Sequence, residues 1–276
     1  MSLATACSSE PEKQDSPYRR SLGREKSMTW RIGRTATLVS LIAFAGRSTA
    51  ALFAQVPADT QQILLVTTKG WDAVLGSAQR LELQGTKFQK VGSPFAVVVG
   101  KTGLAWGLGI RSSDLDITDG PVKKEGDKKS PAGIFALPSA FGYAAEPPRQ
   151  TQLPYFPVTS TSECVDDSNS RHYNELLDGS KVTKDWASSE VMRRNDNFYQ
   201  WGIVVSHNSH PARPGAGSCI FLHIWEGPSE GTVGCTAMQE GNILLLFGWL
   251  DRKKKPILVQ LPESEYAKLR VKWQLP

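Results

Sequence analysis

Residues 221–238 read FLHIWEGPSEGTVGCTAM, and this stretch decides how the whole chain is interpreted. Its first part is apolar and aromatic, which is typical of a strand, and it includes His223. A loop rich in Gly, Pro and Ser follows and ends at Thr232, Gly234 and Cys235. Because a strand and a returning loop can span the twelve positions between His223 and Cys235, we expect these two side chains to meet.

A cysteine and a histidine in this arrangement indicate nucleophilic catalysis. The thiolate is the reacting species, so a Cys nucleophile needs a base within hydrogen-bonding reach, and His223 would take the thiol proton of Cys235. Gly234 removes a side chain next to the sulfur, so the backbone N–H groups of Gly234 and Cys235 can form an oxyanion hole. The alternative is a structural Cys235, which would be a small buried apolar side chain in a non-catalytic domain.

The motif resembles the active-site signature of the L,D-transpeptidase family, whose catalytic domain is of the YkuD type, with a His, a spacer and then Ser/Thr-x-Gly-Cys. Other segments resemble the same family in the expected order: residues 122–127, 130–135, 164–167, 172–174 and 214–223. Two positions depart from the pattern. Val233 stands where many members have His, and Ala237 stands where many members have Arg. No substrate contact is therefore carried over to either position.

The resemblance implies a fold and a reaction. The fold class is mainly β with short helices (α+β), an L,D-transpeptidase-like β-sandwich catalytic domain. Cys235 would attack the carbonyl between the diamino acid at position three and the D-Ala at position four of a peptidoglycan stem tetrapeptide. The resulting thioester would pass to an amine as a 3→3 cross-link, and the carbonyl of Ile224 would orient His223. With water as the acceptor, the same pair would act as a hydrolase, either an L,D-carboxypeptidase or an amidase-like enzyme.

Four further residues are weaker candidates for contacts with the stem peptides: Thr232, Trp225, Asn208 and Asp167. A solvated loop position is an equal alternative for Asp167. The spacing of His207 and His210 matches no standard zinc motif, so we expect no metal, and the family reaction needs no cofactor. The oligomeric state stays open. Peptidoglycan stem peptides are the expected partners, in cell-wall biosynthesis and cell shape.

Residues 1–54 form a predicted leader. They hold eight Lys/Arg and four Asp/Glu, so most of the net charge of +5 lies there and the rest of the chain is nearly neutral. A nucleic-acid partner is therefore not expected. The apolar run over residues 36–46 follows two Arg and precedes small residues, which is typical of a secretory signal peptide, and it is too short to span a membrane.

Other interpretations of the leader are a buried N-terminal helix and an uncleaved membrane anchor. Met28 is an alternative start, which would make residues 1–27 a start-site artefact. We expect export to the periplasm or cell envelope, no membrane span after cleavage, and one catalytic domain over residues 55–276.

Export changes the interpretation of the cysteines. Three cysteines follow the leader: Cys164, Cys219 and Cys235. In an oxidising compartment two of them can form a disulfide, which leaves the third as a free thiol. One interpretation pairs Cys164 with Cys219 and leaves Cys235 free. The other keeps Cys164 and Cys219 as buried thiols.

The hydrophobic pattern favours strands over helices. Strands are predicted over residues 62–68, 94–100, 134–137, 199–205, 218–225 and 257–261. Residues 77–83 fit a short helix or a strand, residues 184–194 fit a helix, and Asn242 can cap a helix over residues 243–250. Turns or loops are predicted over residues 103–109, 130–133, 145–163 and 210–217, and residues 111–129 are expected to be exposed.

Overall fold

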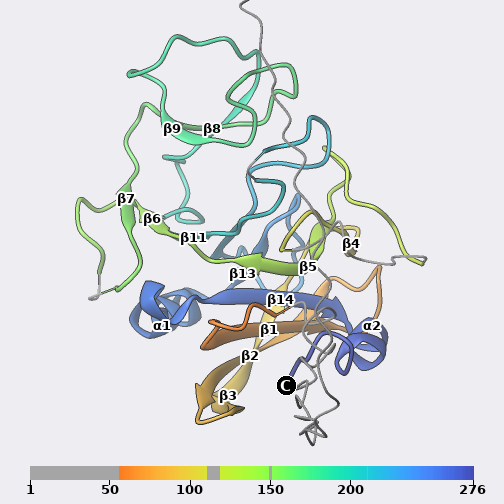
Figure 1. Cartoon of the computed structure of the whole chain (residues 1–276). Coiled ribbons are helices and arrows are strands. Elements are labelled where there is room, and N and C mark those ends of the chain that lie inside the picture. The colour runs from red at the N-terminus through yellow and green to blue at the C-terminus, as the bar shows by residue number, and fades with distance from the viewer. Residues whose placement is uncertain (1–55, 111–118, 149–150, 210) are drawn as a thin grey trace, which may run out of the picture. The chain divides into compact units, whose positions relative to one another are not determined.

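The computed structural model describes residues 56–110, 119–148, 151–209 and 211–276 (Figure 1). The predicted leader therefore lies outside the described residues. These residues form a mainly β structure with two short α-helices, α1 (Glu240–Trp249) and α2 (Glu263–Leu269). No helix among them has the length and hydropathy needed to cross a membrane. The fold class expected from the sequence is confirmed.

Most strands join one mixed sheet of eleven. Their spatial order is β4 (Leu104–Trp106), β5 (Ser130–Ala136), β14 (Ile257–Pro262), β1 (Gln62–Thr68), β2 (Leu75–Gln84), β3 (Lys87–Val98), β13 (Thr236–Met238), β12 (Phe221–Ile224), β11 (Trp201–Val204), β6 (Ala140–Gly142) and β7 (Tyr155–Pro157). A second sheet has the order β10 (Ser189–Val191), β8 (Ser162–Val165), β9 (Leu176–Asp178). Figure 1 shows β8 and β9 apart from the long sheet, at the top of the view.

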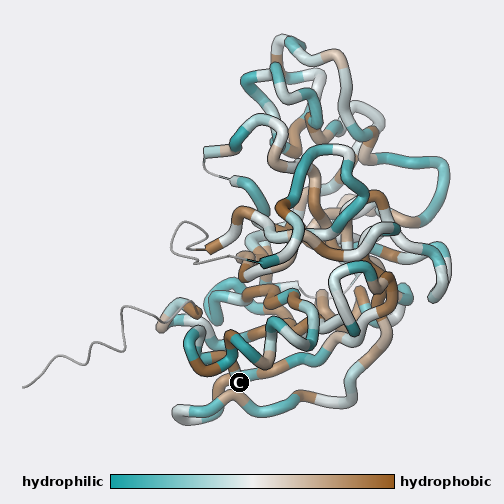
Figure 2. The backbone as a smooth tube through the Cα atoms, turned by 90° about the vertical axis from the view of Figure 1, so that its right-hand side faces the viewer, coloured by the Kyte–Doolittle hydropathy of each residue, from teal (hydrophilic) through white to brown (hydrophobic). Residues whose placement is uncertain are grey.

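Alternation along β12 separates the core from the pocket side of the sheet. Leu222 and Ile224 are buried in the main hydrophobic cluster, together with Phe247 of α1. Side chains of a strand point to opposite faces in turn, so Phe221 and His223 lie on the other face. The apolar residues of β12 and α1 therefore fix which face of the strand presents the histidine. Figure 2 shows the hydrophobic segments gathered inside and the hydrophilic ones in outer loops.

The pairing of β13 with β12 fixes where the loop between these two strands must end. These strands run parallel, with Leu222 opposite Thr236 and His223 opposite Ala237. Cys235 directly precedes β13, so the loop after β12 returns it to the level of the histidine. On the other side of β12, Gly202 of β11 stands opposite His223. A Cβ at Gly202 would lie 2.2 Å from the Phe141 ring, so only glycine fits there.

Several element predictions were correct and several were wrong. Residues 77–83 belong to β2, so the strand alternative holds. The helix predicted over residues 184–194 is wrong, because this segment contains the short strand β10. The turn predicted over residues 130–133 is wrong as well, because these residues begin β5. The helix after Asn242 begins earlier, at Glu240, with Gln239 as its N-cap.

The glycine-rich segment over residues 103–109 contains β4 rather than only loop. Its expected close approach is present, because a Cβ at Gly103 would lie 1.9 Å from the Trp71 carbonyl oxygen. Lys123, expected on an exposed face, is buried and pairs with Asp127 at 2.5 Å. A buried ammonium group needs such a partner, and this ion pair explains its position.

Candidate active site

Cys235 is a buried free thiol held from one side by the backbone. Its Sγ accepts a hydrogen bond from the N–H of Phe221 at 3.3 Å and donates to the carbonyl of Cys219 at 3.5 Å. Its own carbonyl accepts from the hydroxyls of Ser130 at 2.6 Å and Thr232 at 2.5 Å. Four contacts from two directions therefore fix the residue in place.

His223 is oriented by the next peptide unit. Its Nδ1 lies 2.7 Å from the carbonyl oxygen of Ile224. A carbonyl oxygen only accepts, so Nδ1 carries the proton and Nε2 keeps its lone pair free for another donor. This is the contact that the sequence analysis expected of Ile224.

Both side chains line one pocket of about 220 Å³. Its wall also includes Trp225, Thr232 and the exposed Val233. Charged residues of both signs complete the lining: Lys101, Arg194, Glu226 and Glu230. The pocket therefore offers charged groups of both signs to a ligand next to a thiol and an imidazole.

Desolvation acts on both groups in the direction that keeps them neutral. Burial lowers the pKa of His223 to about 4, although the bond to the Ile224 carbonyl acts in the opposite direction. Burial also raises the pKa of the Cys235 thiol well above its usual range. The backbone bonds that hold the sulfur come from residues 219 and 221 and point it away from His223 as a hydrogen-bond partner. The resting site thus holds a neutral thiol and a neutral imidazole in one pocket.

The loop before Cys235 is shaped by Thr232. Its hydroxyl donates to the Cys235 carbonyl and accepts from the N–H of Gly234 at 3.1 Å. The Gly234 N–H is therefore already occupied, which leaves the N–H of Cys235 as the better oxyanion donor of the two candidates.

Two of the weaker candidates lie away from this pocket. Asn208 is buried, and its amide group donates to the carbonyls of Arg213 and Gly217 and so holds a loop together. Asp167 accepts from the N–H groups of Asn169 and Ala187, and these bonds lower its pKa. Neither residue lines the pocket of Cys235.

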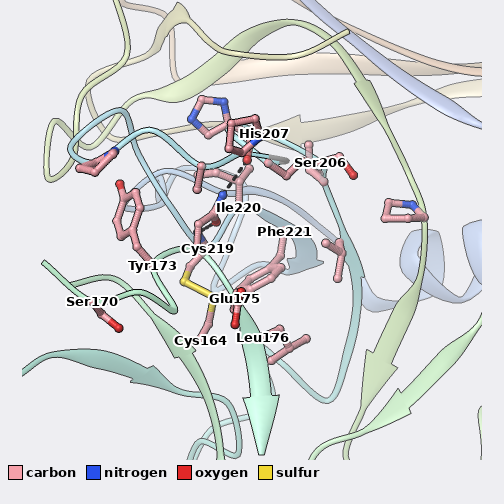
Figure 3. Close-up of a pocket in the computed structure, with 18 of the residues that line it drawn as sticks. Cys164, Ser170, Tyr173, Glu175, Leu176, Ser206, His207, Cys219, Ile220 and Phe221 are labelled. Atoms are coloured by element: carbon pink, nitrogen blue, oxygen red, sulfur yellow. Dashed lines mark hydrogen bonds between the residues drawn. A yellow bond between two sulfur atoms is a disulfide. The ribbon is translucent and has the colours of Figure 1, made fainter. Parts of the chain in front are cut away.

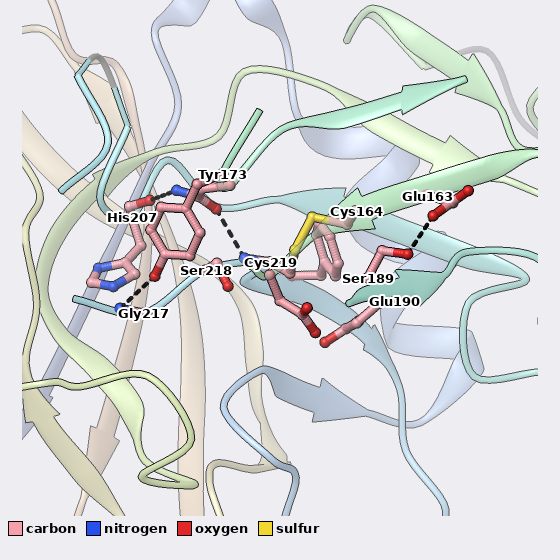
Figure 4. Close-up of a disulfide and its surroundings, with 12 residues drawn as sticks. Glu163, Cys164, Tyr173, Ser189, Glu190, His207, Gly217, Ser218 and Cys219 are labelled. Carbon is pink, nitrogen blue, oxygen red and sulfur yellow. Dashed lines mark hydrogen bonds between the residues drawn. A yellow bond between two sulfur atoms is a disulfide. The ribbon is translucent and has the colours of Figure 1, made fainter. Parts of the chain in front are cut away.

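Cys164 and Cys219 form a disulfide, with their Cα atoms 5.9 Å apart (Figure 4). This is the pairing that leaves Cys235 free. Cys164 belongs to β8, whereas Cys219 precedes β12 and has a positive φ of 55°. The bond therefore links the small sheet to the segment that contacts the Cys235 sulfur.

A family model described as the L,D-transpeptidase catalytic domain, YkuD, matches residues 74–259 of the sequence. The chain belongs to the L,D-transpeptidase family. Its matched region contains every residue of the pocket around Cys235. The sequence matches no curated protein.

Two solved structures are similar to this L,D-transpeptidase-family chain. One is the helical cell shape determining protein Pgp2 (K307A mutant) from Campylobacter jejuni, with a TM-score of 0.39 and 14% identity over 79% of this chain and 53% of that one. The other is Pgp2 without that mutation, with a TM-score of 0.35 and 15% identity over 76% and 53%. The chain thus spans about half the length of these structures.

A larger pocket, of about 740 Å³, is lined in part by residues 219–221 (Figure 3). Figure 3 shows Tyr173, His207 and the disulfide along its wall. Cys235 and His223 do not line it. We therefore place the candidate active site of this L,D-transpeptidase-family chain in the smaller pocket, because only that one contains the thiol and the imidazole.

Four residues of the site were not predicted from the sequence as site residues. Ser130 was assigned to a turn, and Lys101, Arg194 and Tyr199 were not considered as site residues. Tyr199 is buried, lines the pocket, and packs its ring against His223 with centroids 5.2 Å apart. Ser130 lies in the segment 130–135 that resembles the family, whereas no local motif marks Lys101, Arg194 and Tyr199, which the fold brings to the pocket from distant parts of the chain.

Proposed function

We propose that this protein is an exported peptidoglycan L,D-transpeptidase with Cys235 as nucleophile and His223 as base. The carrying observation is that both side chains line one pocket, with Nδ1 of His223 bound to the Ile224 carbonyl and Nε2 left as an acceptor. Family membership supports the reaction class. The disulfide supports export, because such bonds persist outside the reducing cytosol.

The first half of the proposed reaction forms a thioester. His223 Nε2 takes the thiol proton while Sγ attacks the carbonyl between the diamino acid and D-Ala of a stem tetrapeptide. The N–H of Cys235 donates to the developing oxyanion. His223 returns the proton to the amine of the departing D-Ala, so the imidazole ends neutral and the acyl group stays on the sulfur.

The second half transfers the acyl group. An amine of a neighbouring stem peptide loses its proton to His223 and attacks the thioester, which releases the thiol and leaves a 3→3 cross-link. Water in place of the amine gives a carboxypeptidase. The proposed organisation is one catalytic domain over residues 55–276, preceded by a removable leader, and the location is the periplasm or cell envelope.

The test is product analysis on a defined disaccharide tetrapeptide, with and without an added stem-peptide amine. The purified protein is expected to release D-Ala and to form a 3→3 dimer, whereas Cys235→Ala is expected to do neither. Release of D-Ala without a dimer, even at high acceptor concentration, would assign the hydrolase instead. Unchanged activity of Cys235→Ala would reject the proposal.

A non-catalytic, wall-binding domain is the second candidate. It is favoured by one observation, which is that the thiol is buried and hydrogen-bonded away from His223. Such a domain would retain stem peptides in a pull-down with isolated peptidoglycan but release no D-Ala. The two candidates therefore differ in the same product assay.

A further inference from the structure

Tyr199 lies between the candidate nucleophile and a carboxyl group. Its hydroxyl donates to Oε2 of Glu190 at 2.7 Å. The same side chain lines the pocket of Cys235, and only 5% of its surface is exposed. The hydroxyl also acts on the Cys235 thiol as a hydrogen-bonding group, so it has two acceptors near it, the carboxylate and the sulfur.

The strand that carries Glu190 pairs with a strand that is anchored by the disulfide. Glu190 lies on β10 directly opposite Cys164 of β8, and Cys164 is bonded to Cys219. The carbonyl of Cys219 accepts the thiol proton of Cys235. Figure 4 shows Glu190 beside this disulfide. The cross-link therefore fixes the strand of Glu190 against the segment that contacts the sulfur.

The ionisation of the Cys235 thiol and that of the Glu190 carboxyl group depend on each other. Burial is the main cause that raises the pKa of Cys235, and the negative charge of Glu190 raises it further, whereas the hydrogen bond from Phe221 and the neighbouring hydroxyl of Tyr199 lower it. Burial raises the pKa of Glu190 to about 7, and the bond from Tyr199 acts against this rise. The remaining charged groups that influence the pair are Asp166, Arg194 and Glu125 at Glu190, and Lys123 at Cys235.

The hydroxyl of Tyr199 has one proton, so it can donate to one of these acceptors at a time. An ionised carboxylate is the stronger acceptor than a neutral thiol, and the resting bond goes to Glu190. When Glu190 gains a proton from solvent, its own O–H can donate to the Tyr199 oxygen. The phenol proton is then available to the sulfur.

We propose that Tyr199 is the side-chain donor that stabilises the Cys235 thiolate, and that Glu190 is a positioning residue that decides when this donor is available. This inference rests on the proposed role of Cys235 as nucleophile. With Glu190 ionised, the thiol stays protonated, because the donor is engaged and a negative charge stands nearby. With Glu190 neutral, the thiolate gains a donor and loses a repulsive charge.

The test is the rate of alkylation of Cys235 by iodoacetamide between pH 6 and pH 8 in the full chain. The peptide that contains Cys235 is quantified by mass spectrometry, which separates it from Cys7 of the leader. Glu190→Gln is expected to react faster than wild type at pH 8, on the order of fivefold, and at nearly the same rate at pH 6, where Glu190 of the wild type is protonated. Tyr199→Phe is expected to react more slowly than wild type at pH 6, where the neutral Glu190 of the wild type leaves the phenol proton to the thiolate, and at nearly the wild-type rate at pH 8, where ionised Glu190 engages that proton.

Tyr173→Phe is the matched control. Tyr173 donates to Glu125 in a second Tyr–Glu pair, at 2.5 Å, and does not line the pocket of Cys235. This variant is expected to keep the wild-type alkylation profile. In the double variant Tyr199→Phe, Glu190→Gln, the effect of Glu190→Gln is expected to be smaller than in the wild-type background, because the Tyr199 phenol no longer connects the two groups.

Opposite signs for the two single variants separate this role from a structural one, which would move both rates the same way. Near-UV circular dichroism and the presence of the disulfide show that each variant is folded. A Glu190→Gln rate at or below that of wild type at pH 8, or a Tyr199→Phe rate equal to that of wild type at pH 6, would overturn the inference. The assay uses no cell-wall substrate, so wild-type protein that alkylates as expected but releases no D-Ala would refute only the proposed function.

Discussion

The imidazole of His223 and the thiol of Cys235 are both neutral at rest, because burial opposes charge on each of them. Transfer of the thiol proton to His223 creates two opposite charges in a desolvated pocket, which is costly unless they stay paired. A bound substrate lowers this cost when attack and proton transfer occur together. At the scale of single residues, we therefore expect the proposed Cys235–His223 pair to react only when substrate is bound.

Removal of the proposed base gives the sharpest test among single residues. His223→Gln is expected to lower the rate of D-Ala release by about 10²–10⁴-fold, which is the usual contribution of a positioned general base. His207→Gln is the matched control, because His207 is also buried, with a pKa lowered to about 4 by burial, but lines the larger pocket. Its Nε2 lies 3.0 Å from the Ala216 carbonyl.

The comparison is made at a temperature at which circular dichroism shows both variants to be folded. The control is expected to keep a rate within a few-fold of wild type, as for a residue that acts on stability alone. Equal losses in the two variants would contradict the assignment of His223 as base.

The residues of the motif were accessible from the sequence, whereas their partners were not. The spacing of His223 and Cys235 and the resemblance around them indicated the pair and the Ile224 carbonyl. Tyr199 and Glu190 are separated from Cys235 by dozens of positions, and the pairing of β10 with β8 and of β11 with β12 brings them near. Such pairing depends on register between distant strands, which a single sequence does not reveal.

At the scale of elements, the long strands were predictable and the short ones were not. Residues 62–68 form β1 within the predicted bounds because they are rich in β-branched and apolar side chains. Residues 184–194 contain good helix formers but form no helix. Trp186 and Met192 are buried there, as the pattern suggested, yet β10 pairs with β8 instead. Tertiary pairing outweighs local propensity in so short a segment.

The strand predicted over residues 218–225 begins later than expected, for a related reason. Residues 218–225 were expected to form one strand, and in a regular strand Cys219 and His223 would lie on the same face. The strand begins only at Phe221, and Cys219 has a left-handed backbone conformation that ends the regular alternation. This turn lets Cys219 reach Cys164 while Phe221 contacts the Cys235 sulfur.

Removal of the disulfide is expected to destabilise the protein. The bond closes a loop with a sequence separation of 55 residues, for which the chain-entropy model gives about 4 kcal/mol. The double variant Cys164→Ser, Cys219→Ser should therefore unfold at a clearly lower urea concentration than wild type. Cys235→Ser, which keeps the disulfide, is the control and should lose much less. Equal midpoints for the double variant and the wild type would contradict a stabilising role.

At the scale of the whole molecule, two buried histidines make stability depend on pH. The pKa values of His207 and His223 are both lowered to about 4, mainly by burial. In the unfolded chain each has its ordinary value of about 6.5, so between pH 6.5 and pH 4 the unfolded state binds more protons. Their contribution to stability is therefore complete above pH 6.5 and is lost as the pH falls toward 4.

The raised pKa of Glu190 acts in the opposite direction, because between about pH 4.5 and pH 7 the folded state binds its proton more tightly. A difference between variants isolates one histidine from this background. From pH 7 to pH 4.5, His207→Gln is expected to lose about 2 kcal/mol less unfolding free energy than wild type. Urea unfolding at the two pH values measures this. Parallel losses in the two proteins would show that His207 is not buried in its neutral form.

The central claim is that the sulfur of Cys235 becomes acylated by a stem peptide, and intact-mass spectrometry tests it most directly. Wild-type protein mixed with a disaccharide tetrapeptide and quenched in acid within the first turnover is expected to gain the mass of the substrate less D-Ala. Peptide mapping should place this adduct on Cys235, and Cys235→Ala should gain nothing. Substrate turnover without any adduct on Cys235, or the same adduct on the Cys235→Ala protein, would contradict the account.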